Sequence, residues 1–168
     1  ELCSTMPKVN DPISNNNTSK DTCKFVSLSE KRKKAISKVL KKSGAKEILG
    51  MDKKHFTKLK GIDSARRIVD KNGIFSADVV LVPLEDGDRT IALKKAKKKI
   101  ITFDLNPLSR TAQTADITIV DNVTRAMKLL VIESKKKSKK HQIYNNKKNL
   151  KMAILEIRKN LEGRAKSV

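Results

Sequence analysis

A-D-V-V-L-V-P-L, at residues 77–84, is the stretch that decides the fold. A strand that is buried on both faces, as in a parallel sheet, has this kind of apolar, Val-rich sequence. Two similar runs follow, K-I-I-T-F at residues 99–103 and I-T-I-V at residues 117–120. Helical patterns are expected over about residues 89–98 and 124–134, and a loop over residues 104–113. Because strands and helices alternate, the sequence predicts an α/β fold with a parallel sheet flanked by helices.

The flanking residues have weaker patterns. Residues 1–28 contain two prolines and a run of three Asn, which predicts a poorly ordered or divergent loop segment. Ser29 is expected to cap a helix over about residues 30–43, which Gly44 ends. A short strand is expected at residues 47–50, whereas residues 51–75 give no clear pattern. The apolar stripe of the first helix would consist of Ala35, Ile36, Val39 and Leu40.

The chain is therefore divided into three regions. Residues 1–28 form the N-terminal segment, and residues 29–134 form the main domain. Residues 135–168 form a basic linker and a C-terminal amphipathic helix over about residues 148–162.

The formal net charge of +21 comes from 39 Lys and Arg against 18 Asp and Glu. The excess lies outside the strand-rich centre, since residues 76–125 carry a net charge of +1 and residues 131–168 a net charge of +9. Lysine-rich solvated faces account for this pattern and would also attract anionic ligands. No apolar run approaches the roughly 18–20 residues of a membrane helix. With two Cys and no signal-like start, a cytoplasmic protein without membrane contact is expected.

Polar side chains follow each of the three predicted strands. Asp86, Asp88 and Arg89 follow the first strand, residues 104–111 read D-L-N-P-L-S-R-T after the second, and D-N follows the third. The carboxyl ends of parallel strands share one edge of a sheet, where ligands bind in such folds. Arg side chains can fork onto phosphate oxygens, and Asp can hold Mg²⁺. The residues alone therefore predict an anion-binding α/β domain, although helix capping explains any single loop equally well.

Three long strings carry a more specific signal. They are G-I-F-S-A-D-V-V-L-V-P-L-E-D-G-D-R-T at residues 73–90, D-L-N-P-L-S-R-T-A-Q-T-A at 104–115 and I-T-I-V-D-N-V-T-R-A at 117–126. In this order they resemble the archaeal 4-phosphopantoate–β-alanine ligase family, also called archaeal phosphopantothenate synthetase. The resemblance covers about residues 30–134, and Y-N-N-K-K-N-L at residues 144–150 more loosely.

The resemblance implies a Rossmann-like ATP-binding domain at residues 29–134 and a homodimer. It also implies an enzyme that joins 4-phosphopantoate and β-alanine to give 4-phosphopantothenate in coenzyme A biosynthesis. ATP would activate the acid as an acyl-adenylate, with release of AMP and pyrophosphate. Asp86, Asp88 and Arg89 are a possible site for Mg²⁺ or phosphopantoate, from their chemistry and position. The implied ATP contacts are Asp104, Leu105, Asn106, Arg110, Thr111, Asn122 and Val123.

Two alternatives stay open. The family has a helical N-terminal portion with further Arg residues, which the chain is expected to lack, so this fragment could be inactive alone or a non-catalytic remnant. A basic nucleic-acid-binding protein that uses the Lys135–Lys148 region is the second alternative, although Tyr144 is the only side chain there that could stack on a base. No sequence-specific nucleic acid partner is expected. The contacts to β-alanine, any general base and the dimer surface are left open by the sequence.

Overall fold

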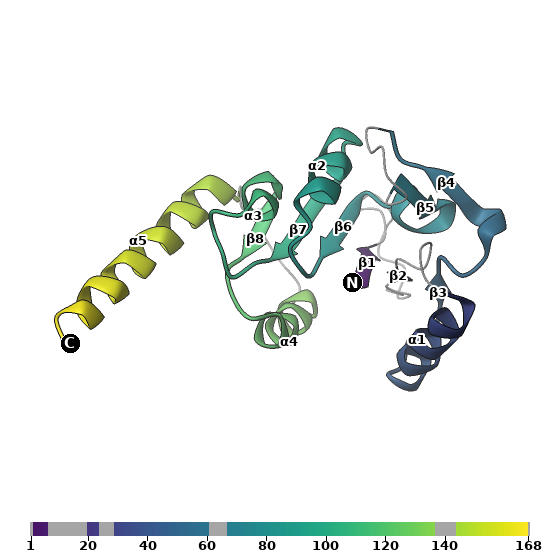
Figure 1. Cartoon of the computed structure of the whole chain (residues 1–168), viewed down its shortest axis with the longest axis horizontal. Coiled ribbons are helices and arrows are strands. Elements are labelled where there is room, and N and C mark those ends of the chain that lie inside the picture. Colours follow the sequence, from purple (N-terminus) through teal and green to yellow (C-terminus); the bar gives the residue numbers. More distant parts are fainter. Residues whose placement is uncertain (1, 7–19, 24–28, 61–66, 137–143, 168) are drawn as a thin grey trace.

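A six-stranded sheet forms the centre of the described chain (Figure 1). The computed structural model describes residues 2–6, 20–23, 29–60, 67–136 and 144–167. The strand order is β3-β2-β1-β6-β7-β8. The bounds are β1 Leu2–Met6, β2 Lys20–Cys23, β3 Ile48–Leu49, β6 Val79–Val82, β7 Lys99–Phe103 and β8 Ile117–Ile119.

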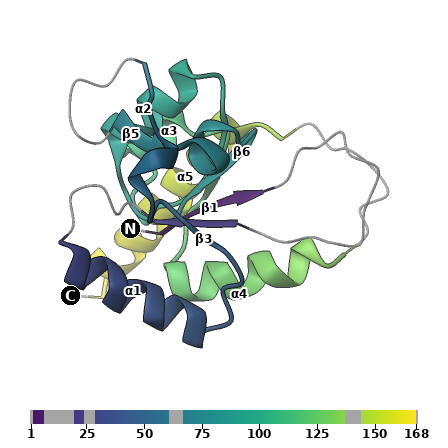
Figure 2. The same ribbon diagram turned by 90° about the vertical axis from the view of Figure 1, so that its right-hand side faces the viewer.

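The strands β6, β7 and β8 are parallel neighbours, so their carboxyl ends meet at one edge, which we call the carboxyl edge. Each is followed by a helix: α2 (Gly87–Lys95), α3 (Arg110–Thr114) and α4 (Val123–Ser134). The helices α2 and α3 lie on one face of the sheet and α4 on the other (Figures 1 and 2). The predicted α/β fold, with a parallel sheet flanked by helices, is confirmed.

Side-chain alternation along the strands separates two cores. Val80 and Ile100 are fully buried on the face covered by α2, where they pack in one cluster with Leu93. Leu81 and Phe103, which point to the opposite face, pack with α4. Because successive strand residues point to opposite faces, an uninterrupted apolar strand can supply both cores at once.

Two expectations for local structure were wrong. Residues 2–6 and 20–23 lie in the expected loop segment but form strands, with β1 antiparallel to both β2 and β6. Pairing with the free edge of β6 stabilises strands whose own sequences are weakly apolar, because strand formation depends strongly on neighbours. The predicted loop over residues 104–113 ends earlier, because Ser109 caps α3 by accepting a hydrogen bond from Ala112 N. The division into residues 1–28, 29–134 and 135–168 stays a prediction.

The helix α1 (Glu30–Lys42) begins at its predicted cap, where the Ser29 side chain accepts a hydrogen bond from Arg32 N. The described residues cover its predicted apolar stripe only in part, since Ile36 and Leu40 are half-buried whereas Val39 is 64% exposed. Lys33 is buried instead, and its ammonium group lies 2.8 Å from Glu30. The periodicity therefore located the helix correctly, but of the predicted stripe only Ile36 and Leu40 lie on the covered face, beside Lys33.

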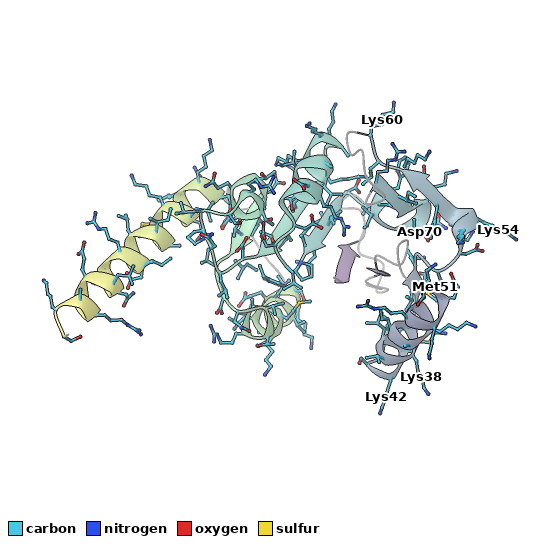
Figure 3. The ribbon with its side chains drawn as sticks, in the orientation of Figure 1. Lys38, Lys42, Met51, Lys54, Lys60 and Asp70 are labelled. Carbon is cyan, nitrogen blue, oxygen red and sulfur yellow. The ribbon has the colours of Figure 1, made fainter. Side chains whose placement is uncertain are left out.

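The described residues 51–60 and 67–75 form a small unit beside the main sheet. The strands β4 (Phe56–Lys58) and β5 (Ile68–Asp70) pair in antiparallel register between a 3₁₀ turn, η1 (Lys53–His55), and an irregular helical turn, η3 (Lys71–Phe75). Asp70 is buried, and its carboxylate accepts hydrogen bonds from Gly50 N and Asn72 N. Figure 3 labels Lys54 and Lys60 in this unit and Lys38 and Lys42 on α1, and all four side chains point outward.

The last helix, α5 (Asn146–Ala165), is attached through its first turn and then extends away from the body (Figure 1). Asn146 Oδ1 accepts a hydrogen bond from Thr118 N at 2.8 Å, and Asn149 Nδ2 donates to Thr118 O at 2.9 Å. These side chains bind the outer edge of β8 as a neighbouring strand would, which protects an open sheet edge. The Y-N-N-K-K-N-L string thus has a structural role.

Asp116 joins two elements of the sheet and one helix. Its carboxylate accepts hydrogen bonds from Ile100 N at 2.9 Å and from Lys94 Nζ at 2.6 Å. Partial burial raises the pKa of Asp116, but the hydrogen bonds from Lys94 and Ile100 N outweigh it and the net pKa is lowered.

We expect Asp116→Asn to lower the free energy of unfolding by about 1 kcal/mol at neutral pH, since the charge-assisted hydrogen bond is lost. A carboxylate whose folded-state pKa is lowered stabilises the protein above its unfolded-state pKa, and this contribution disappears as pH falls through the folded-state pKa. The difference between wild type and variant should therefore narrow below about pH 4. Urea unfolding at several pH values measures it, and a difference independent of pH would contradict this account.

Candidate functional site

The loop after β6 is fixed by Asp86, the N-terminal cap of α2. Its Oδ1 accepts a hydrogen bond from Arg89 N at 3.3 Å, and its backbone oxygen accepts one from the Thr90 hydroxyl at 2.8 Å. Arg89 is 6% exposed, and its Nε lies 3.6 Å from Asp86 Oδ2. Asp86 and Arg89 therefore form a buried pair that stabilises the loop.

The D-L-N-P-L-S-R-T loop after β7 is shaped by its own side chains. Asp104 Oδ1 accepts a hydrogen bond from Asn106 N at 2.9 Å, and Oδ2 accepts one from the Ser109 hydroxyl. Asn106 Oδ1 in turn accepts one from Leu108 N at 2.9 Å. These hydrogen bonds fix the conformation of the loop, in which Leu105 is 67% exposed.

The loop after β8 begins α4. Asn122 is its cap, because its Oδ1 accepts hydrogen bonds from Thr124 N and the Thr124 hydroxyl. Asp121 Oδ1 accepts from Asn122 N and binds the guanidinium group of Arg125. The hydrogen bond from Arg125, and then that from Asn122 N, lower the pKa of the Asp121 carboxyl group.

The three loops are joined to one another. Asp86 N donates a hydrogen bond to the Thr111 hydroxyl at 3.0 Å, which links the loops after β6 and β7. Arg110 Nη1 donates to Asp88 Oδ1 at 2.9 Å across the same junction. The loops after β7 and β8 share a carbonyl group, since the Ile119 oxygen accepts from Asp104 N at 3.2 Å and from Asp121 N at 3.0 Å. The carboxyl edge is therefore one connected polar surface.

Gly87, the first residue of α2, permits the close approach of Arg110. A Cβ atom at this position would lie 3.0 Å from Arg110 Cβ and 3.1 Å from its Nε. A side chain at this position would require the Arg110 side chain to shift by a few tenths of an ångström. The glycine in E-D-G-D-R thus determines where the exposed guanidinium group lies.

The predicted site residues differ in exposure and in position. Thr111 and Arg89 are buried, and their described contacts support the loops. Asp88 and Arg110 are about two-thirds exposed in their side chains, 64% and 65%, and are open to a ligand. Val123 begins α4 beside the Asn122 cap. The remaining predicted residues, Asp86, Asp104, Leu105, Asn106 and Asn122, lie in the three joined loops.

Asp86 and Asp88, from the possible Mg²⁺ or phosphopantoate site, both lie in ion pairs in the described structure. Each carboxylate is paired with an arginine, Arg89 and Arg110 respectively. Within the described ranges, no three His, Cys, Asp or Glu side chains form a group that could hold a metal ion. A Mg²⁺ ion at such an edge would take most of its ligands from nucleotide phosphates and water, as this ion commonly does.

Sequence reasoning missed the roles of Asp121 and Arg125. Arg125 lies within the matched string I-T-I-V-D-N-V-T-R-A but was not among the expected site residues. Its spacing of four residues from Asp121 was a usable signal, because side chains at i and i+4 meet along a helix. Ser109, which orders the loop after β7 through Asp104, was likewise not identified.

In the described part of the chain, every helix is too short or too polar to span a membrane. The protein-family model for phosphopantothenate/pantothenate synthetase matches residues 21–160. A 4-phosphopantoate–β-alanine ligase of Methanosarcina mazei is 47% identical over 138 residues, which is 77% of this chain and 53% of that protein. Those of Thermococcus onnurineus and Thermococcus kodakarensis are 48% and 46% identical over 141 residues, 79% of this chain and 53% of each protein. The chain thus spans about half the length of these curated relatives.

Proposed function

The chain belongs to the phosphopantothenate/pantothenate synthetase family, and from this premise we propose that its carboxyl edge binds ATP and 4-phosphopantoate for amide formation with β-alanine. The product is 4-phosphopantothenate, a step of coenzyme A biosynthesis. The observation that carries the proposal is the exposed Arg110, held by Asp88 beside the self-ordered loop after β7. An oriented arginine is suited to bind phosphate oxygens through paired hydrogen bonds.

The proposed mechanism activates the acid before the amide bond forms. The 4-phosphopantoate carboxylate attacks the α-phosphorus of ATP, which gives an acyl-adenylate and pyrophosphate. The β-alanine amine then attacks the acyl carbon, loses a proton and displaces AMP. The protein brings two anions together, and two unit charges about 4 Å apart repel by roughly 4 kcal/mol at an effective dielectric constant near 20. Arg110, with its guanidinium group fixed by Asp88, offsets part of this repulsion.

Two loops of the carboxyl edge have separate tasks in this mechanism. The loop at residues 104–109 presents Leu105 and Asn106 to the nucleotide, since the side chain of Asp104 is occupied in ordering it. Asn122 and Val123 present the first turn of α4, where helix N–H groups favour an anion. We assign Mg²⁺ no resident site, and when bound with ATP it would neutralise phosphate charge.

A direct assay tests the proposed reaction. The purified protein is incubated with ATP, 4-phosphopantoate and isotopically labelled β-alanine, and the products are followed by mass spectrometry. Labelled 4-phosphopantothenate that forms only when all three substrates are present supports the function. Stable binding of ATP without amide formation would instead favour the non-catalytic alternative.

The homodimer is part of the same proposal. Exposed apolar side chains on α4 and the outer half of α5 support it, because solvent-facing positions of this kind favour a protein contact. On α5, Leu161 is 62% exposed, because this part of the helix extends away from the sheet. Sedimentation velocity should give twice the chain mass, and a monomer at micromolar concentration would contradict it. The exposed apolar residues are Leu129, Val131, Ile132, Met152, Leu155, Ile157 and Leu161.

A further inference from the structure

The helices after β6, β7 and β8 share one feature, which is an arginine in the first turn. Arg89 is the third residue of α2, Arg110 the first of α3 and Arg125 the third of α4. The N-terminus of a helix carries partial positive charge, so acidic side chains are favoured in this turn and basic ones are not. Three basic side chains placed there at the same sheet edge oppose local stability. They place three guanidinium groups, each paired with an aspartate, at the edge where the proposed substrates are anions.

An aspartate holds each of these arginines. Arg89 pairs with Asp86 and is buried, whereas the other two project to solvent. Arg110 is bound by Asp88, and its side chain is 65% exposed. Arg125 donates from both Nε and Nη2 to one oxygen of Asp121, and its side chain is 70% exposed. Because Asp121 engages only one side of the guanidinium group, further N–H groups remain accessible to a ligand.

Arg110 and Arg125 are each connected to the loop after β7. That loop begins at Asp104, whose N–H group shares the Ile119 carbonyl oxygen with Asp121 N, so it starts beside the residue that holds Arg125. At its other end the loop leads into α3, which begins with Arg110. The helices α3 and α4, which carry the two arginines in their first turns, cover opposite faces of the sheet (Figures 1 and 2).

Resting on the proposed function, we infer that Arg125, positioned by Asp121, is a second phosphate-binding arginine of the carboxyl edge. Its ligand is a phosphate group, either of ATP or of 4-phosphopantoate. The reaction brings two phosphorylated anions to one edge. Arg110 would offset the charge of one of them, and Arg125 would offset the charge of the other. A guanidinium group fixed at Nε and Nη2 loses little further freedom when it binds phosphate oxygens, which favours Arg over Lys at this position.

The test is titration calorimetry of the Arg125→Gln variant with ATP and, in a second arm, with 4-phosphopantoate. We expect the affinity for at least one of the two to fall about tenfold. Arg125→Lys, which keeps the charge without the planar fork, should recover part of the lost affinity. A loss of affinity for ATP alone assigns the contact to the nucleotide phosphates. A loss of affinity for 4-phosphopantoate alone assigns it to the phosphate group of that acid.

Arg158→Gln is the matched control. Arg158 is also exposed and paired with an acidic residue at i+4, Glu162, but it lies on the outer half of α5. The Arg158→Gln variant should bind both ligands as the wild type does. Thermal unfolding should show that Arg158→Gln and Arg125→Gln are both folded, because exposed ion pairs contribute little to stability. If the wild type binds a ligand and Arg125→Gln binds both ligands equally well, the inference is wrong although the proposed function stands. If the wild type binds neither ligand, the proposed function falls and the inference with it.

Discussion

Replacing Arg110 with Ala is expected to weaken ATP binding by about 1.5–3 kcal/mol, which is the contribution of a charge-assisted hydrogen bond to phosphate. The structure supplies the reason for this size. The guanidinium group is already oriented by its 2.9 Å hydrogen bond to Asp88, and Gly87 leaves room for it there. It can therefore bind phosphate without a large loss of side-chain entropy. Titration calorimetry of wild type and variant measures the difference.

Arg158→Ala is the control for this experiment, since it removes an exposed, ion-paired arginine far along α5. It should leave ATP affinity unchanged. The Arg110–Asp88 pair is itself exposed, so the Arg110→Ala variant should keep almost all of its stability. Equal ATP affinities for Arg110→Ala and wild type would remove Arg110 from the site.

Asn146→Ala is expected to lower the free energy of unfolding by about 2–4 kcal/mol, because it leaves several backbone groups without their hydrogen bonds. Asn146 accepts from Thr118 N at 2.8 Å and donates to the oxygens of Ala112 and Ala115 at 2.9 and 3.0 Å. Water is not expected to replace all three hydrogen bonds at this half-buried junction. Urea unfolding measures the loss.

Two further variants make this prediction specific. Asn160→Ala removes an asparagine that bonds only within the exposed part of α5, to Glu156, and should change stability little. Asn146→Asp keeps the acceptor for Thr118 N but loses the two donors, so it should be destabilised nearly as much as Asn146→Ala. If all three variants unfold like the wild type, α5 is not attached through Asn146.

The strands of the carboxyl edge could be predicted because burial on both faces leaves a continuous apolar run in the sequence. The strand β7 was expected at residues 99–103 and is found at Lys99–Phe103. The helix α3 was missed because it has five residues, too few for a periodic pattern. The strand β2, with the sequence K-D-T-C, has no apolar run, and its pairing with β1 and β3 comes from residues distant in the sequence.

The candidate site could be located from residue types but not resolved into roles. Asp86, Asp104 and Asn122 follow their strands as expected, since parallel strands bring their ends together. The pairing of Arg110 with Asp88 joins residues 22 positions apart, and nothing in the local sequence indicates it. The sequence also does not distinguish the exposed Arg110 from the buried Arg89, because that difference depends on how α2 packs.

The nucleotide product tests the central claim most directly. With 4-phosphopantoate, β-alanine, ATP and Mg²⁺, the protein should release AMP and pyrophosphate in a one-to-one ratio with 4-phosphopantothenate. The sequence has no G-x-x-x-x-G-K-[ST] loop that would present a γ-phosphate for transfer, so attack at the α-phosphorus is the use of ATP that suits this edge. Chromatography of the nucleotides decides between the two chemistries. AMP and pyrophosphate are the predicted result, and ADP with orthophosphate would contradict the proposed mechanism.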